Sequence, residues 1–145
     1  MKKIILSILL FVAVAVITNA QETTTSNPIN PNAPKFKFET ETIDYGTIEH
    51  NANGDREFKF TNVGKEPLII TKAIPSCGCT IPIAPTEPIL SGASSVIKVH
   101  YATDRVGAFE KIITLNSNAD TPQKIIKIKG IVKADPAKAI SADQK

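Results

Sequence analysis

Apolar and polar side chains alternate along most of the chain between residues 36 and 132. The clearest example is residues 126–129, where two isoleucines alternate with two lysines. A period of two places successive side chains on opposite faces, so each such run predicts a β-strand with one buried face. We predict seven strands, at residues 36–39, 43–48, 56–61, 68–71, 96–101, 109–115 and 126–129.

Turn-forming residues, chiefly Gly, Asn, Asp and Pro, separate the predicted strands. They lie at residues 53–55, 62–64, 91–92, 106–107 and 120–122. No run after residue 20 keeps the 3.6-residue spacing of an amphipathic helix. Short strands at this spacing predict an all-β fold, an antiparallel β-sandwich of about seven strands, with a small barrel as the alternative.

The start of the chain has a different composition. A short positive start precedes the apolar run 4–17, and small or polar residues follow as far as Ala20. This pattern is typical of a cleaved secretory signal peptide at residues 1–20. The apolar run is shorter than the ~20 residues that a membrane-spanning helix needs. We therefore expect a periplasmic or secreted protein, with no stable membrane span after cleavage.

Two polar segments flank the strand region. Residues 21–35 contain three prolines and few apolar side chains, and residues 133–145 are rich in alanine and charged residues. Segments of this kind bury too little apolar surface to offset the entropy of ordering. We predict a disordered linker and a disordered tail around one folded domain at residues 36–132.

The net charge of the chain bears on which classes of partner it could bind. The whole chain has 17 basic and 14 acidic residues, and loss of Lys2 and Lys3 with the leader would leave it close to neutral. Such a domain has no electrostatic basis for binding nucleic acid or an anionic membrane. The sequence has no phosphate-binding glycine loop, nucleophile elbow or carboxylate cluster with metal spacing, so we predict no cofactor and no enzyme.

A set of short motifs occurs in order along the strand region. They are Phe36-x-Phe38, Ile43-Asp44-Tyr45-Gly46-x-Ile48, Phe58-x-Phe60-x-Asn62-Val63-Gly64, Pro67-Leu68-x-Ile70, Ser76-Cys77-Gly78-Cys79-Thr80, Gly92, Val99-x-Tyr101, Gly107-x-Phe109-x-Lys111, Ser117-Asn118 and Ile128-x-Gly130-x-Val132. Together they resemble the DUF1573 family of exported bacterial proteins of unknown function, and more distantly the PapD-like chaperones and the sandwich modules of ciliary proteins. The resemblance implies an immunoglobulin-like fold and export, and it brings no established activity.

The only two cysteines, Cys77 and Cys79, lie one residue apart after the fourth predicted strand. In an exported protein thiols tend to pair, and Gly78 permits the tight backbone that a bond between such close residues requires. The small ring would be strained and easily reduced. Four interpretations stay open: a local structural disulfide, a redox-active pair, a soft-metal site for copper or zinc, and free buried thiols.

Few other residues are candidates for chemistry. His100, in the predicted strand 96–101, is the nearest candidate to join Cys77 and Cys79 at a metal, and His50 lies in a loop. A solvated position is the alternative for both histidines. Asp44, two residues before Gly46, is expected to cap its own turn.

We interpret the domain as a non-enzymatic protein-interaction module of the bacterial envelope. Sandwiches of this kind bind a protein or peptide through loops or through a sheet edge, and Ser76, Gly78 and Thr80 are candidate contacts in the cysteine loop. The competing interpretation is a thiol redox or copper- or zinc-handling protein that uses Cys77 and Cys79.

Overall fold

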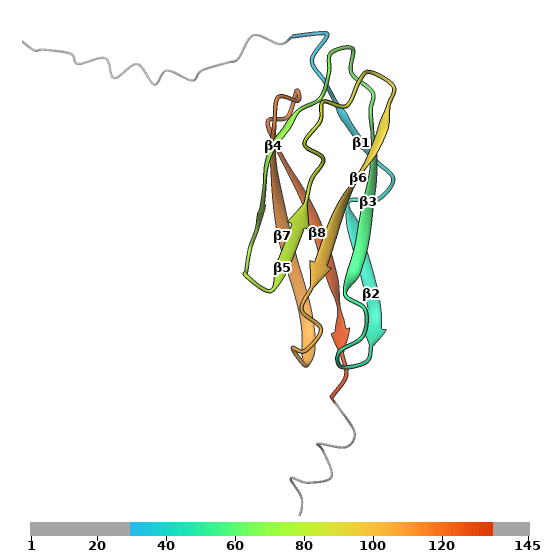
Figure 1. The fold of residues 1–145 in the computed structure, drawn as a ribbon, viewed down its shortest axis with the longest axis vertical. Coiled ribbons are helices and arrows are strands. Elements are labelled where there is room, and N and C mark those ends of the chain that lie inside the picture. Colours follow the sequence, from blue (N-terminus) through green and yellow to red (C-terminus); the bar gives the residue numbers. More distant parts are fainter. Residues whose placement is uncertain (1–29, 135–145) are drawn as a thin grey trace, which may run out of the picture.

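The computed structural model describes residues 30–134, so the predicted leader and most of the predicted linker and tail lie outside the described residues. The described chain forms eight strands in two stacked sheets (Figure 1). Within residues 30–134, no helix has the length and apolar character needed to cross a membrane. The predicted all-β sandwich is confirmed.

The observed strands overlap the predicted runs, but their bounds differ, notably at the fourth run, 68–71, where the strand spans Ile70–Pro75. The strands are β1 (Phe36–Phe38), β2 (Thr42–Ile48), β3 (Asp55–Asn62), β4 (Ile70–Pro75), β5 (Thr80–Ile83), β6 (Ser94–Tyr101), β7 (Gly107–Ser117) and β8 (Gln123–Val132). Seven of them correspond to predicted strands. The eighth, β5, is not among the predicted strands, because its four residues contain Pro82 and read as part of a turn.

The two sheets have the strand orders β1–β3–β6–β5 and β2–β8–β7–β4. Neighbouring strands are antiparallel except β2 and β8, which run parallel. The chain passes to the other sheet between β1 and β2, so β2 lies along the last strand instead of returning against β1. The sandwich therefore differs at this one pair from the purely antiparallel arrangement that we predict from the sequence.

Apolar side chains of the alternating runs fill the space between the sheets. Phe58, Ile97 and Val99 from one sheet, and Ile113 and Ile126 from the other, are each at most 1% exposed. Burying a side chain of this size contributes about 1.5–3 kcal/mol. This shared apolar layer holds the two sheets face to face.

A buried asparagine closes one end of the sandwich. Asn62, the last residue of β3, is 0% exposed. Its Oδ1 accepts hydrogen bonds from the backbone N–H groups of Lys35 (3.2 Å) and Gly64 (3.0 Å). Its Nδ2 donates to the carbonyl oxygens of Glu66 (2.8 Å) and Ile89 (3.0 Å). One amide group therefore bonds four backbone groups from three segments of the chain.

Residues 30–35, the end of the predicted linker, pack against the turn that follows β3. The N–H groups of Lys65 and Glu66 donate to the carbonyl oxygen of Asn32, at 3.2 and 3.1 Å. A side chain at Gly64 would collide with the backbone of Ala33, so glycine permits this close approach. The contacts of the folded unit thus begin ahead of residue 36.

We expect Asn62→Ala to lower the free energy of unfolding by about 3 kcal/mol, because two backbone N–H groups and two carbonyl groups each lose a hydrogen bond to its buried amide. Thr61→Ala is the matched control, since Thr61 is the preceding residue and its hydroxyl bonds Ser94 in an exposed setting. The control should lose less than ~1 kcal/mol. Urea denaturation measures both losses, and equal losses would contradict the role of Asn62.

Candidate functional site

The cysteine segment carries the chain from one sheet to the other. Residues 76–79, which we call the disulfide corner, link β4 at the edge of one sheet to β5 at the edge of the other, at the light-green turn in Figure 1. The Ser76 N–H donates to the Ile112 carbonyl (2.8 Å), and the Ala102 N–H donates to the Cys79 carbonyl (2.9 Å). Each end of the corner is thus held by a different sheet.

Cys77 and Cys79 are joined as a disulfide across this corner. Their Cα atoms lie 5.3 Å apart, within the range of about 4.4–6.8 Å that a disulfide needs. A turn at Gly78 brings them closer than an extended strand would allow. This arrangement is the one that the local-disulfide interpretation requires.

The disulfide closes a very small ring, which limits its contribution to the stability of the fold. In the chain-entropy treatment, a three-residue loop contributes roughly 1.5–2 kcal/mol, against about 4.7 kcal/mol for a loop of 100 residues. The bond also joins two residues of the same turn and leaves the two sheets without a covalent link. It therefore stiffens the corner locally, and the apolar core holds the sheets together.

The residues of the cysteine motif differ sharply in exposure. Ser76 and Gly78 are exposed, and Cys77 is half-buried. Cys79 is 7% exposed and packs with the core, and Thr80 is 1% exposed. Ser76 and Gly78 are thus available for contact with a partner, whereas the Thr80 side chain, also proposed as a loop contact, is directed inward.

The Thr80 hydroxyl lies beside both sulfur atoms. Its Oγ1 is 3.7 Å from Cys77 Sγ and 3.9 Å from Cys79 Sγ. The backbone N–H of Cys79 donates to Cys77 Sγ at 3.3 Å. The sulfur pair therefore has one backbone and one hydroxyl group within hydrogen-bonding range.

The two histidines do not join the sulfurs. In the register of β5 and β6, Thr80 faces Tyr101 on the buried side, so the next pair, Ile81 and His100, points outward. His100 Nδ1 lies 2.7 Å from Asp55 Oδ1, and His50 Nε2 lies 3.1 Å from the Asp104 carbonyl oxygen. The predicted metal set of Cys77, Cys79 and His100 is not brought together. Residues 30–134 also contain no group of three or more His, Cys, Asp or Glu placed to hold a metal.

Three exposed isoleucines lie next to the disulfide corner, on the outer face of the β2–β8–β7–β4 sheet. Ile74, Ile112 and Ile125, which we call the isoleucine face, are 39%, 38% and 50% exposed. Thr114 lies between Ile74 and Ile125 in the register of β4, β7 and β8. Sequence reasoning missed this surface, although doublets such as Ile112-Ile113 in an alternating strand must place one isoleucine outward.

A proline occupies the free edge of the sheet on each side of the corner. Backbone groups of an edge strand point alternately toward the neighbouring strand and toward the free edge. Ser76 and Cys79 bond toward their neighbours, so Pro75 in β4 and Pro82 in β5 point their nitrogens outward. Proline has no N–H to offer an incoming strand. Both edges are therefore poor templates for strand addition.

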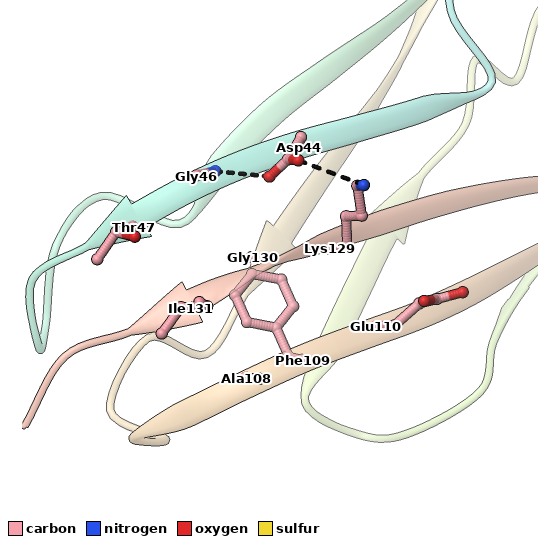
Figure 2. Close-up of a pocket in the computed structure, with 9 residues that line it drawn as sticks. All are labelled: Asp44, Gly46, Thr47, Ala108, Phe109, Glu110, Lys129, Gly130 and Ile131. Carbon is pink, nitrogen blue, oxygen red and sulfur yellow. Dashed lines mark hydrogen bonds and ion pairs between the residues drawn. The ribbon is translucent and has the colours of Figure 1, made fainter.

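A shallow depression of about 480 Å³ lies over β2, β7 and β8 and includes no residue of the corner (Figure 2). Its lining residues are Asp44, Gly46, Thr47, Ala108, Phe109, Glu110, Lys129, Gly130 and Ile131. It forms where the register of β2 and β8 shifts between Asp44 and Thr47, with Gly46 at a φ of +63° that favours glycine. No Ser, Cys or His is among its lining residues.

Two charged groups of this depression, Asp44 and Lys129, pair with each other. Asp44 Oδ1 accepts a hydrogen bond from the Gly46 N–H (2.8 Å), and Asp44 Oδ2 lies 3.4 Å from Lys129 Nζ, as Figure 2 shows. The bond from Gly46 lowers the pKa of Asp44 below its usual value, and Lys129 adds to the effect. Asp44 thus caps its own turn, as predicted, and the depression is a consequence of the bulge.

Tyr45 packs behind the bulge in an aromatic cluster. Its ring lies edge-on to Phe109, with ring centroids 5.4 Å apart, and the Arg56 guanidinium lies 4.3 Å from its ring centroid. The Tyr45 hydroxyl donates to the Gly54 carbonyl at 2.8 Å. Burial raises the pKa of Tyr45 to about 12. This side chain therefore serves as a neutral structural link between β2 and the start of β3.

Two stacked sheets, crossed by the chain at a local disulfide, define an immunoglobulin-like sandwich of the PapD-like kind. The family model described as "Protein of unknown function (DUF1573)" matches residues 36–132, and the chain belongs to this family. No curated protein matches the chain.

Solved structures share the fold at low sequence identity. A protein of unknown function from Porphyromonas gingivalis W83 has a TM-score of 0.62 and 14% identity, over 72% of this chain and 50% of that one. The seventh PapD-like (ASH) domain of human CEP192 has a TM-score of 0.56 and 12% identity, over 73% and 91%. The CsuC–CsuE chaperone–tip adhesion subunit complex of Acinetobacter baumannii has a TM-score of 0.51 and 11% identity, over 76% and 60%. This chain thus spans half of the Porphyromonas protein, and these likenesses show the fold alone.

We expect stability to fall between about pH 10 and pH 12, and Tyr45→Phe to remove part of this fall. The ordinary tyrosine pKa of 10.0 applies to the unfolded chain, whereas the folded value for Tyr45 is about 12. Unfolding therefore releases a proton in this window, so stability present below pH ~10 is lost as the pH rises.

Urea midpoints at about pH 9 and pH 11, for the wild type and the variant, measure this effect. Absorbance titration of the two tyrosines follows ionisation directly, and burial also raises the pKa of the second one, Tyr101. Equal pH dependence in both proteins would contradict the assignment to Tyr45.

Proposed function

We propose that the domain is an exported, non-enzymatic module of the bacterial envelope that binds a protein or peptide partner through its isoleucine face. The observation that carries this proposal is the exposure of Ile74, Ile112 and Ile125 on neighbouring strands, each at least 38% exposed. Clustered apolar side chains on the surface of a folded domain are typical of interaction sites.

Two features favour binding to this face over strand addition beside the corner. Pro75 and Pro82 remove backbone donors from the free edges of β4 and β5. Ser76, which is exposed, adjoins the isoleucine face because its Oγ accepts a hydrogen bond from the Ile112 N–H (3.1 Å). A partner on this face would meet apolar side chains at its centre and a polar, conformationally restricted corner at its rim, which is the usual layout of an interface.

Fold neighbours support a binding role for the domain. One of them comes from the complex of the chaperone CsuC with the tip adhesion subunit CsuE, which is consistent with a binding role for a domain of this fold. The described residues bring together no nucleophile, base and orienting group of the kind that acyl or phosphoryl transfer needs. Binding of a protein or peptide partner is the simplest function that these features support.

Export of the protein rests on its N-terminal sequence. A basic start, the apolar run 4–17 and a small residue at position 20 fit a cleaved leader. A disulfide between Cys77 and Cys79 is consistent with an oxidising compartment. We therefore place the binding event in the periplasm or outside the cell.

We expect the mature protein to begin at Gln21 and to fractionate with the periplasm or the medium. Intact-mass measurement of protein expressed in a Gram-negative host, combined with osmotic-shock fractionation, checks both points. A matched variant with Asp at Leu9 should remain uncleaved in the cytosol, because a charge in the apolar run disrupts recognition of the leader. An uncleaved wild-type chain in the cytosol would contradict export.

A photo-crosslinking residue at Ile112 or Ile125 should yield one discrete adduct in living cells, and the same adduct at both positions. Lys59 is the matched control, because it is exposed on β3 in the opposite sheet. Ile112→Lys combined with a crosslinker at Ile125 should lower the adduct yield at least tenfold, since a charge would enter the apolar contact. Equal adducts from Lys59, or none from either isoleucine position, would contradict the proposed surface.

A further inference from the structure

The two cysteines of the disulfide corner differ in exposure. Cys79 is 7% exposed and packs with the core, whereas Cys77 is only half-buried against it. Thiol–disulfide exchange begins when a thiolate attacks one sulfur of the bond, so the attacked sulfur must be within reach. An incoming thiol therefore meets Cys77 first.

Cys77 also has neighbours that suit a thiolate. The Cys79 N–H donates to Cys77 Sγ at 3.3 Å, and Thr80 Oγ1 lies 3.7 Å from the same sulfur. Thr80 is 1% exposed, so its hydroxyl is shielded from water and lies beside the sulfurs. Hydrogen bonds to the charged form of an acid favour that form. Both groups would stabilise a thiolate on Cys77 after reduction of the bond.

We propose that Cys77 and Cys79 form a thiol–disulfide exchange site whose substrates are disulfide-bonded or dithiol proteins. Cys77 is the sulfur that joins the partner, and Cys79 is the sulfur that releases it. This inference goes beyond the proposed binding function and rests on different residues. The small ring is consistent with this proposal. A disulfide that adds little to the stability of the domain can be reduced and re-formed while the apolar core keeps the fold intact.

The reaction balances as two successive exchanges. In the reduced domain, the Cys77 thiolate attacks one sulfur of the partner's disulfide, and the partner's other sulfur leaves as a thiolate. Cys79, after losing its proton, then attacks Cys77 Sγ in the mixed disulfide and displaces the partner's remaining sulfur. Two electrons pass to the partner, and the two protons lost by Cys77 and Cys79 complete its two thiols. A dithiol protein reverses these steps to reduce the domain again.

The test compares Cys79→Ser with Cys77→Ser in the full mature chain, with glutathione disulfide as the probe. Intact mass should show one glutathione added to Cys79→Ser at least ten times faster than to Cys77→Ser. The difference should vanish in urea, where both thiols are exposed. Equal rates in the folded proteins, or faster reaction of Cys77→Ser, would overturn the assignment of Cys77 as the attacking sulfur.

The wild-type chain supplies a readout that does not depend on the folding of either variant. After reduction by dithiothreitol, brief alkylation and peptide mapping should label Cys77 at least five times more than Cys79. In a separate sample, reduced but not alkylated, glutathione disulfide should restore the internal bond without accumulation of the mixed disulfide. A stable mixed disulfide on the wild-type chain would show that Cys79 does not resolve it, and would overturn the exchange mechanism.

Substitutions at Thr80 distinguish a thiol–disulfide exchange site from a purely structural disulfide. Thr80→Val keeps the shape of the side chain and removes the hydroxyl, so the pH–rate profile of the Cys79→Ser reaction should move to higher pH. Thr80→Ser should restore the original profile. An unchanged profile in Thr80→Val would contradict the role of the hydroxyl. These readouts need no binding partner, so their failure is distinct from failure of the crosslinking experiment.

Discussion

The chain passes from one sheet to the other five times. The fold depends on hydrogen-bond partners for the backbone groups at each of these crossings. A backbone that leaves a sheet loses its ladder partners, and buried N–H and C=O groups without partners are costly. At the crossing after β3, the amide of Asn62 takes up four of these groups. At the crossing after β2 the Tyr45 hydroxyl bonds the Gly54 carbonyl, and at the crossing after β6 the Thr103 hydroxyl bonds the Ala52 carbonyl (2.6 Å).

The crossing between β4 and β5 has a local disulfide in addition to the backbone hydrogen bonds that hold its two ends. The disulfide corner has exposed residues at Ser76 and Gly78, the isoleucine face beside it, and proline on both adjoining edges. The crossings at Asn62, Tyr45 and Thr103 rely on neutral hydrogen bonds, which respond little to the environment. A bond between sulfurs responds to the redox state of its compartment, so this corner is the place where the surroundings of the protein can act on its surface.

The alternation of apolar and polar residues was sufficient to predict most of the strands and their buried faces. Alternation located seven strands and assigned Phe58, Ile97, Ile113 and their neighbours to one buried face, because burial repeats with the pleat. It missed β5, since Pro82 normally interrupts a strand and is tolerated here only at the free edge. The parallel pairing of β2 with β8 also could not be predicted from the local residue pattern. It depends on which sheet the chain joins after β1.

The candidate site was predictable in identity and less so in geometry. From the sequence, a local disulfide between Cys77 and Cys79 was one of four open interpretations, and the structure joins these two residues. Their unequal exposure depends on how the corner sits on the core, which no local spacing encodes. The same holds for His100, whose position relative to the sulfurs was set by the register of β5 and β6.

The parallel pairing of β2 and β8 has a mechanical consequence. The described chain begins at one end of the sandwich and leaves at the other (Figure 1), so a pulling force on these two ends would draw β2 and β8 past each other along their length. Hydrogen bonds loaded in this shearing direction share the force and must break together, whereas a hairpin peeled from its end breaks them one by one. A domain with this arrangement should therefore resist stretching along the line that joins these two ends.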